Sequence, residues 1–221
     1  MDELGDLVDV TTLAVALISV GGTLGGTLGG AVLSQRAGRA QAAEQNQRAD
    51  REREEERAEQ ALQAKRDLYA HVNTAARAYR VAARDAVEAA ERGESVDPAL
   101  LDAAKEAWAE QYSQAQMALA YEVLQVASAL NRSLGVGYSV VKQLPSSPQL
   151  DVAYQRAKKW FSDPLSDGVY LLRVTLRHDL GVEVDPHFEQ IRWQVLTKLE
   201  TARKDLVRQL AAERVQAAGP N

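Results

Sequence analysis

The sequence predicts an all-α protein with a single N-terminal transmembrane helix, a long charged helical stalk and a cytoplasmic bundle of four to five helices. Three observations support this fold class. An uncharged segment long enough to cross a membrane lies near the N-terminus, apolar residues recur with helical spacing from Leu62 onwards, and strand-like alternation is absent over any useful length. The predicted order is an acidic extracytoplasmic tail (1–9), the transmembrane helix (10–35), the stalk (36–61), the bundle (62–217) and a short tail (218–221).

Composition narrows the class of protein further. The chain has 221 residues, a net charge of −5 and no cysteine. Without cysteine there are no disulfides, thiolate metal sites or cysteine nucleophiles. The modest negative charge argues against a general nucleic-acid binder, which needs a basic face. Aromatic residues make up only 5% of the chain, so the core is expected to consist mainly of Leu, Val and Ala.

The segment between Asp9 and Arg36 carries no charge, and its length fits a transmembrane helix of about 20 mostly apolar residues. A secretory signal peptide is the second interpretation, but the N-terminus lacks the Lys or Arg that it needs. The third is a soluble apolar helix followed by a glycine linker. Six glycines in residues 21–30 would melt a helix in water, whereas a bilayer enforces the helix because its core offers the backbone no water. We therefore prefer the membrane interpretation.

The charges on either side of this segment predict its orientation. Four acids and no basic residue precede it, and five arginines follow between residues 36 and 53. Basic flanks stay in the cytoplasm. We therefore expect a protein of the inner (plasma) membrane with its N-terminus outside and its C-terminal domain in the cytoplasm.

Glycines form two rows on this predicted helix, each with a spacing of four residues. Small residues at this spacing let a second helix approach closely, so the rows predict helix–helix association between identical chains. The competing interpretation is that membrane helices simply tolerate glycine. The candidate association residues are Gly21, Gly22, Gly25, Gly26, Gly29 and Gly30.

The stalk is rich in Ala, Glu, Gln and Arg and has no Leu, Ile, Val or aromatic residue. A helix that is polar all round is held by side-chain pairs, for example Arg48 with Glu52 and Arg53 with Glu56. The alternative is a disordered charged linker. The absence of proline favours the helix. At its start, the candidates for contact with anionic lipid headgroups are Arg36 and Arg39.

Apolar residues with helical spacing predict the first bundle helix over residues 62–87, ended by Gly93. A second helix is expected to start at Asp97-Pro98, an N-cap acid followed by a proline in the first turn, and to run unbroken through Leu130. The expected core positions of the first helix are Leu62, Leu68, Tyr69, Val72, Ala76, Tyr79, Ala83 and Val87.

Turn signals predict the remaining boundaries. The same Asp-Pro pair opens two further helices, and Gly181 occupies the position of a C-terminal cap. The last helix is expected to bury Phe188, Ile191, Val195, Leu199, Ala202, Leu206 and Leu210. Boundaries are expected at Gly135 and Gly137, at the proline-rich segment 144–148, at Asp163-Pro164 and at Asp185-Pro186.

No pattern typical of catalysis or metal binding emerges. The paired Glu-x-x-His motifs of di-iron bundles, the phosphate loop and the serine elbow are all absent. We therefore expect no enzyme activity, no cofactor and no catalytic residue, and we expect His71, His178 and His187 at the surface or its boundary. Trp108 is expected in the core. Lys158 to Phe161 form either a basic–aromatic edge for a membrane or partner, or a buried Trp160–Phe161 pair beneath two solvated lysines, which we prefer.

These segments together predict a single-pass, membrane-anchored helical interaction or scaffold protein that self-associates through its glycine-rich transmembrane face. Its expected partners are the membrane, further copies of the chain and an unidentified protein, with no nucleic acid. The alternative is a pore-forming or holin-like protein that permeabilises the membrane. That alternative uses the same glycines but leaves the large bundle unexplained.

Overall fold

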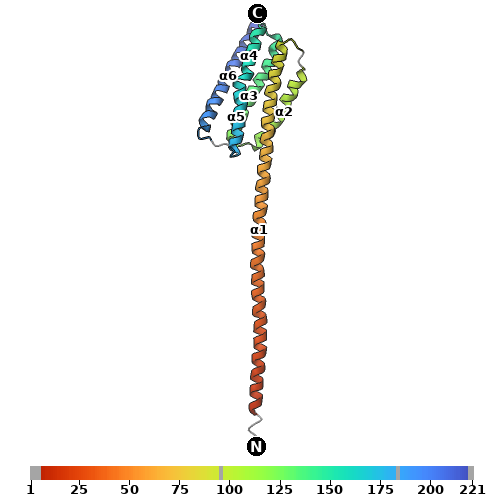
Figure 1. Cartoon of the computed structure of the whole chain (residues 1–221), viewed down its shortest axis with the longest axis vertical. Helices are drawn as coiled ribbons and strands as arrows, with labels where there is room; N and C mark the ends of the chain where they lie inside the picture. Colours follow the sequence, from red (N-terminus) through yellow and green to blue (C-terminus); the bar gives the residue numbers. More distant parts are fainter. Residues whose placement is uncertain (1–5, 95–96, 183–184, 219–221) are drawn as a thin grey trace. The chain divides into compact units, whose positions relative to one another are not determined.

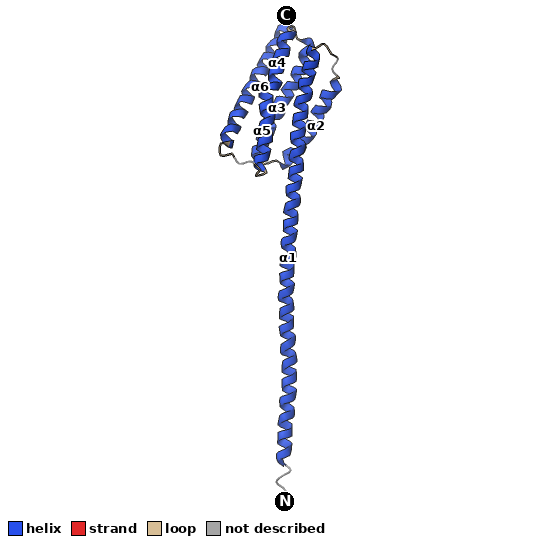
Figure 2. Ribbon diagram, viewed as in Figure 1, coloured by secondary structure: helices blue, strands red, loops and turns tan. Residues whose placement is uncertain are grey.

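In the computed structural model, every regular element among the described residues is a helix, which confirms the all-α class for this part of the chain (Figure 1, Figure 2). The backbone is described for residues 6–94, 97–182 and 185–218, and the side chains for residue 41 and for 44–215 outside those gaps. The elements are α1 (Asp6–Glu91), α2 (Pro98–Ala118), α3 (Tyr121–Gln143), the 3-10 turn η1 (Leu144–Ser146), α4 (Leu150–Ser162), α5 (Pro164–Asp179) and α6 (Phe188–Ala218). The chain divides into two compact units, Met1–Ala61 and Leu62–Asn221.

In the first unit, α1 passes through the charged segment, where Arg48 and Arg53 each pair with an acid one turn toward the N-terminus. Arg48 Nη2 lies 2.5 Å from Glu44 Oε1, and Arg53 Nη1 lies 3.3 Å from Asp50 Oδ1. The expected partners, which lie on the C-terminal side of each arginine, are therefore wrong. An acid placed before a base suits the helix dipole better, which accounts for the observed choice.

Among the described residues, no helical stretch combines the length and the apolar character that a membrane crossing requires. The predicted transmembrane helix at 10–35 lies outside the part of the chain whose side chains are described. The same holds for the six glycines of residues 21–30 and for Arg36 and Arg39.

The second unit is a helical bundle made of the end of α1, from Leu62, together with α2 to α6 (Figure 1). α3, α5 and α6 pack against one another, α4 packs against α5 and α3, and α2 packs against α3. The end of α1 joins the same core through one face. Its buried side chains include the predicted positions Tyr69, Val72, Ala76, Tyr79, Ala83 and Val87.

Two predicted core positions lie at the edge of the bundle instead. Leu62 and Ile191 are each 39% exposed. Among the α1 residues whose side chains are described, the first buried one is Tyr69, two turns after Leu62, so Leu62 precedes the packed part of the bundle. Near Ile191, the buried positions of α6 are taken by Phe188 and Arg192.

The predicted second helix is in fact two helices, α2 and α3, separated at Leu119 and Ala120. Both residues have extended backbone, with ψ of 140° and 154°. Side-chain hydrogen bonds connect the two helices across this break. The two residues of each bonded pair lie at nearly equal distances in sequence from residue 120, as in an antiparallel helical hairpin. The joined pairs are Tyr112–Ser128, Trp108–Asn131 and Asp102–Tyr138. The expectation of one unbroken helix is therefore wrong, because packing between α2 and α3 overrides local helix propensity.

The glycines at 135 and 137 do not interrupt α3, which continues to Gln143. Gly137 is buried against the aromatic pair on α4: a Cβ built on it would lie 2.9 Å from Phe161 Cε1 and 3.1 Å from Trp160 Nε1. The predicted burial of this pair is confirmed, with Trp160 4% and Phe161 0% exposed. Gly137 is thus a point of close helix packing rather than a helix end.

The three Asp-Pro pairs differ in how they start a helix. Asp97 caps α2, because its Oδ1 accepts a 2.9 Å hydrogen bond from the backbone N–H two residues later. Asp185 makes the same kind of bond at 2.8 Å, and α6 then begins at Phe188. Asp163 makes no cap bond and instead accepts a hydrogen bond from Lys198.

The predicted C-terminal cap at Gly181, after α5, is confirmed by its left-handed φ of 68°.

Candidate functional site

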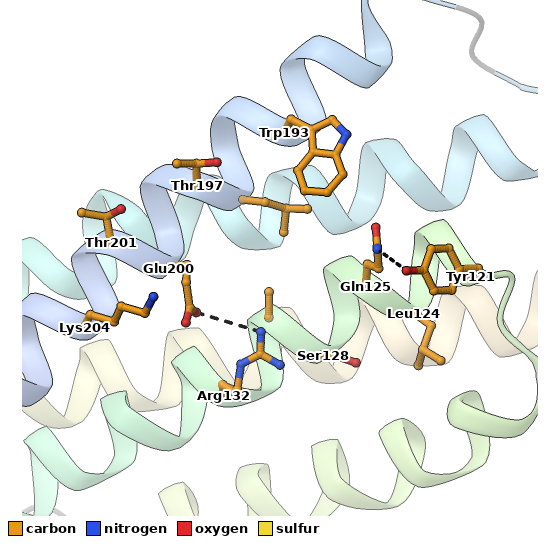
Figure 3. Close-up of a pocket in the computed structure, with 12 residues that line it drawn as sticks. Tyr121, Leu124, Gln125, Ser128, Arg132, Trp193, Thr197, Glu200, Thr201 and Lys204 are labelled. Atoms are coloured by element: carbon orange, nitrogen blue, oxygen red, sulfur yellow. Dashed lines mark hydrogen bonds and ion pairs between the residues drawn. The ribbon is translucent and has the colours of Figure 1, made fainter.

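A groove of about 560 Å³ runs between α3 and α6 on the surface of the bundle (Figure 3). Both walls are helical, and each contributes residues from successive turns of one face. α3 provides Tyr121, Leu124, Gln125, Ser128, Ala129 and Arg132, and α6 provides Trp193, Leu196, Thr197, Glu200, Thr201 and Lys204. The groove therefore has the form of a trough along two packed helices.

The amphipathic pattern of the two helices explains why these residues reach the surface. α3 turns Val126 and Leu130 into the core, and α6 does the same with Leu199 and Leu206. The groove residues are the next positions around each helix, so they combine part-buried leucines with hydroxyls and charges. Ala129, only 5% exposed, is the small residue where α3 meets the groove.

One end of the groove is aromatic and held in place by a buried arginine. Trp193 is 54% exposed, and the Arg192 guanidinium lies 5.3 Å from the centre of its ring. Arg192 is itself only 5% exposed; it donates to Gln125 Oε1 at 2.7 Å and to Glu189 Oε2 at 2.6 Å. Gln125 in turn donates to the Tyr121 hydroxyl at 2.8 Å (Figure 3). This chain of bonds ties α3 to α6 beneath the tryptophan.

The other end of the groove is charged. The Glu200 carboxylate lies 2.7 Å from the Arg203 guanidinium and 4.0 Å from that of Arg132 (Figure 3). The hydrogen bond from Arg203 lowers the pKa of Glu200 despite its partial burial, and Arg132 and Lys204 add to this effect. Glu200 is therefore an anion at neutral pH. Arg132 and Lys204 remain exposed at the rim.

This arrangement is suited to binding. Apolar side chains line its middle, an exposed indole marks one end, and two cations stand at the other. Groove hydroxyls can exchange hydrogen bonds with a ligand; Ser128 already bonds the Tyr112 hydroxyl at 3.0 Å. The features resemble those of surfaces that recognise a helix, with an aromatic anchor, an apolar floor and a polar rim.

The groove was not predicted from the sequence, and only one signal pointed to it. Trp193 and Leu196 lie off the stripe that α6 buries, so the helix carries a second, weaker apolar face.

The three histidines lie at or near the surface and are not grouped. His71 and His187 are exposed, and His178 stacks on Phe188 with 4.0 Å between ring centres. Within the part of the chain that is described, no group of His, Asp or Glu is arranged to hold a metal ion.

Comparison of the chain with protein families, with curated proteins and with solved structures finds no match.

Proposed function

We propose that the chain is a single-pass, membrane-anchored helical interaction protein whose bundle binds a helix of a protein partner in the α3–α6 groove. The observation that carries this proposal is the exposure of Trp193. The other tryptophans, Trp108 and Trp160, are 2% and 4% exposed, whereas Trp193 is 54% exposed at the mouth of a groove. Tryptophan is the residue most enriched at the energetic centres of protein interfaces.

The shape and charge of the groove favour an amphipathic helix as its occupant. A trough between two helices accepts a third helix by packing its apolar stripe against the floor, here Leu124 and Leu196. Arg132 and Lys204 stand at one end, while Glu200, the only carboxylate among the described residues that line the groove, is bonded to Arg203. The partner helix should therefore carry acidic residues beside its apolar stripe.

The membrane part of the proposal rests on the sequence. The uncharged segment 10–35 and its basic C-terminal flank support a spanning helix with the bundle in the cytoplasm, at the inner (plasma) membrane. The two glycine rows support association of identical chains there. Replacing Gly25 and Gly26 with Leu should reduce crosslinked oligomers in membranes, and unchanged oligomers would refute this role. A C-terminal reporter enzyme that works only outside the cytoplasm should stay inactive.

The groove is tested by photo-crosslinking in native membranes. A photoreactive amino acid at Thr197, inside the groove, should crosslink a discrete partner, and the same amino acid at Glu106, exposed on α2, should not. Trp193→Ala in the Thr197 background should abolish the crosslink without changing the circular dichroism of the bundle. Mass spectrometry of the crosslinked peptide then identifies the occupant.

Two outcomes would contradict the groove proposal. One is equal crosslinking from Thr197 and Glu106, because it would indicate random collisions. The other is a crosslinked peptide that comes from the chain itself, because the groove would then join two copies rather than hold a partner. A peptide with an apolar stripe flanked by acids is the expected result.

A further inference from the structure

Three arginines surround a second, smaller hollow on the bundle, between α1 and α5. α1 contributes Arg77 and Arg80, α5 contributes Arg173, and the hollow measures about 260 Å³. Its other lining residues are neutral: Asn73, Ser166, Val169 and Tyr170. Among the described residues, no Asp or Glu lines it. In a chain with a net charge of −5, a concentration of positive charge at one point needs an explanation.

The spacing of the polar residues is the same on both helices. Asn73 is followed by arginines four and seven positions later, and Ser166 is followed by Tyr170 and Arg173 at the same intervals. Positions i, i+4 and i+7 lie on one face of a helix. Each helix therefore presents a polar face to the hollow, with a short neutral donor at one end and a guanidinium at the other.

The arginines of this hollow lack the partners that most cations of the bundle have. Lys65 lies 2.7 Å from Asp179, Lys198 lies 2.7 Å from Asp167, and Arg84, one turn beyond the hollow on α1, lies 2.9 Å from Asp85. For Arg77 and Arg173, by contrast, the described part of the chain offers no carboxylate within 4.0 Å. The Arg173 guanidinium instead lies 5.0 Å from the Tyr170 ring centre.

Arg80 sits in the least favourable environment of the three. Its Nη1 donates to the Phe161 carbonyl at 3.1 Å, but its Nε is buried with no hydrogen-bond partner in the described structure. Burial lowers its pKa, and the neighbouring charges of Arg84 and Arg77 lower it further. The charge of Asp85 opposes these effects only in part, and a guanidinium stays charged in proteins, so the positive charge of Arg80 persists. An anion in the hollow would relieve it.

We propose that the hollow between α1 and α5 binds a phosphate group through Arg77, Arg80 and Arg173. A guanidinium group can bond two phosphate oxygens at once, and guanidinium groups supplied by two helices, two from α1 and one from α5, can together hold a tetrahedral anion. The hollow has the volume of about nine liquid waters at roughly 30 Å³ each, which suits one phosphate with a few waters. Free phosphate and the phosphate of a lipid headgroup share this chemistry.

Binding is measured by equilibrium dialysis of the full-length chain against radiolabelled inorganic phosphate, with chloride at constant ionic strength. A non-ionic amphipol keeps the chain in solution and leaves added vesicles intact. Arg77→Gln and Arg173→Gln should each weaken phosphate binding by about tenfold, because each removes a charge-assisted donor. Arg208→Gln removes an exposed arginine from α6 and should leave the affinity unchanged.

Added vesicles separate the two sources of phosphate. If phosphatidylcholine vesicles with phosphatidic acid displace the labelled phosphate and pure phosphatidylcholine vesicles do not, the site accepts a lipid headgroup. If neither displaces it, the ligand is the free anion. The proposal is overturned if the wild-type chain binds neither phosphate at millimolar concentration nor the phosphatidic acid vesicles. It is also overturned if Arg208→Gln weakens binding as much as the two test variants do.

Discussion

Two glycines on the same helix provide a direct test of how tightly α3 packs against α4. At Gly135 an added Cβ would meet no atom within 4 Å, whereas at Gly137 it would meet Phe161 Cε1 at 2.9 Å and Trp160 Nε1 at 3.1 Å. Both positions are helical, so Gly→Ala removes the same backbone entropy cost at each, about 0.5–1 kcal/mol. Gly135→Ala should therefore stabilise the bundle by about that amount.

Gly137→Ala gains the same helix propensity but forces a methyl group into buried aromatic rings. Overpacking of this kind costs about 1–3 kcal/mol. Both variants gain the same helix propensity, so this contribution cancels when they are compared. The difference between their free energies of unfolding therefore gives the steric cost at Gly137. For a unit of this size, about 1–3 kcal/mol corresponds to a separation in melting temperature of roughly 2–12 °C.

The assay is thermal unfolding followed by near-ultraviolet circular dichroism. All three tryptophans of the chain lie in the bundle, at 108, 160 and 193, so the signal reports on this unit alone. Gly135→Ala should melt above the wild type and Gly137→Ala below Gly135→Ala. Equal melting temperatures for the two variants would refute the close packing of Gly137 on the aromatic pair.

Two further predictions concern charged residues of the bundle. Burial raises the pKa of Asp179, but hydrogen bonds from Lys65 and Tyr69 outweigh it and hold the pKa below its usual value. A carboxylate with a lowered pKa stabilises the fold above its unfolded pKa of about 3.9, so the free energy of unfolding should fall as the pH drops from about 5 to 3. Urea titrations should show a shallower fall for Asp179→Asn, and an unchanged slope would contradict this. Asp97→Ala should lower the free energy of unfolding by about 1 kcal/mol, because it removes the cap of α2. Asp163→Ala should lower it by less, because Asp163 makes no cap bond. Equal losses for the two variants in urea denaturation would contradict this prediction.

The sequence predicts well those features that depend on neighbouring residues. The buried stripe of α1 follows from helical spacing alone, and the caps at Asp97 and Gly181 follow from the conformations that Asp and Gly favour at helix ends. These signals need no knowledge of the rest of the fold, because they act within one or two turns of the same helix.

The hairpin between α2 and α3 could not be predicted in this way. Leu119 and Ala120 are good helix formers, and neither is a glycine or a proline. The break exists because α2 folds back on α3, where Trp108 Nε1 donates to Asn131 Oδ1 at 2.8 Å. Conversely, the sequence around Gly137 predicts a helix end, because glycine is common there. Its actual role is to contact the Trp160–Phe161 pair, and neighbouring residues alone cannot predict a contact with a distant segment.

The α3–α6 groove likewise could not be predicted from local sequence, because its two walls lie about 70 residues apart in the chain. Its two walls are joined by Arg192, which is only 5% exposed. A buried guanidinium is retained only when its hydrogen bonds are satisfied, and here Gln125 and Glu189 do so.

This buried arginine also bears on the proposed binding of a partner helix in the groove. Because Arg192 bonds both walls and its guanidinium lies 5.3 Å from the centre of the Trp193 ring, the spacing of α3 and α6 and the position of the indole are already fixed in the chain alone. A preformed groove loses less conformational entropy on binding than one that must order itself. Arg192→Met, which keeps the bulk but removes the bonds, should therefore weaken partner binding mainly through a less ordered groove. Crosslinking from Thr197 would then decrease while Trp193 becomes more accessible to acrylamide quenching; an unchanged crosslink would show that the groove does not depend on this preorganisation.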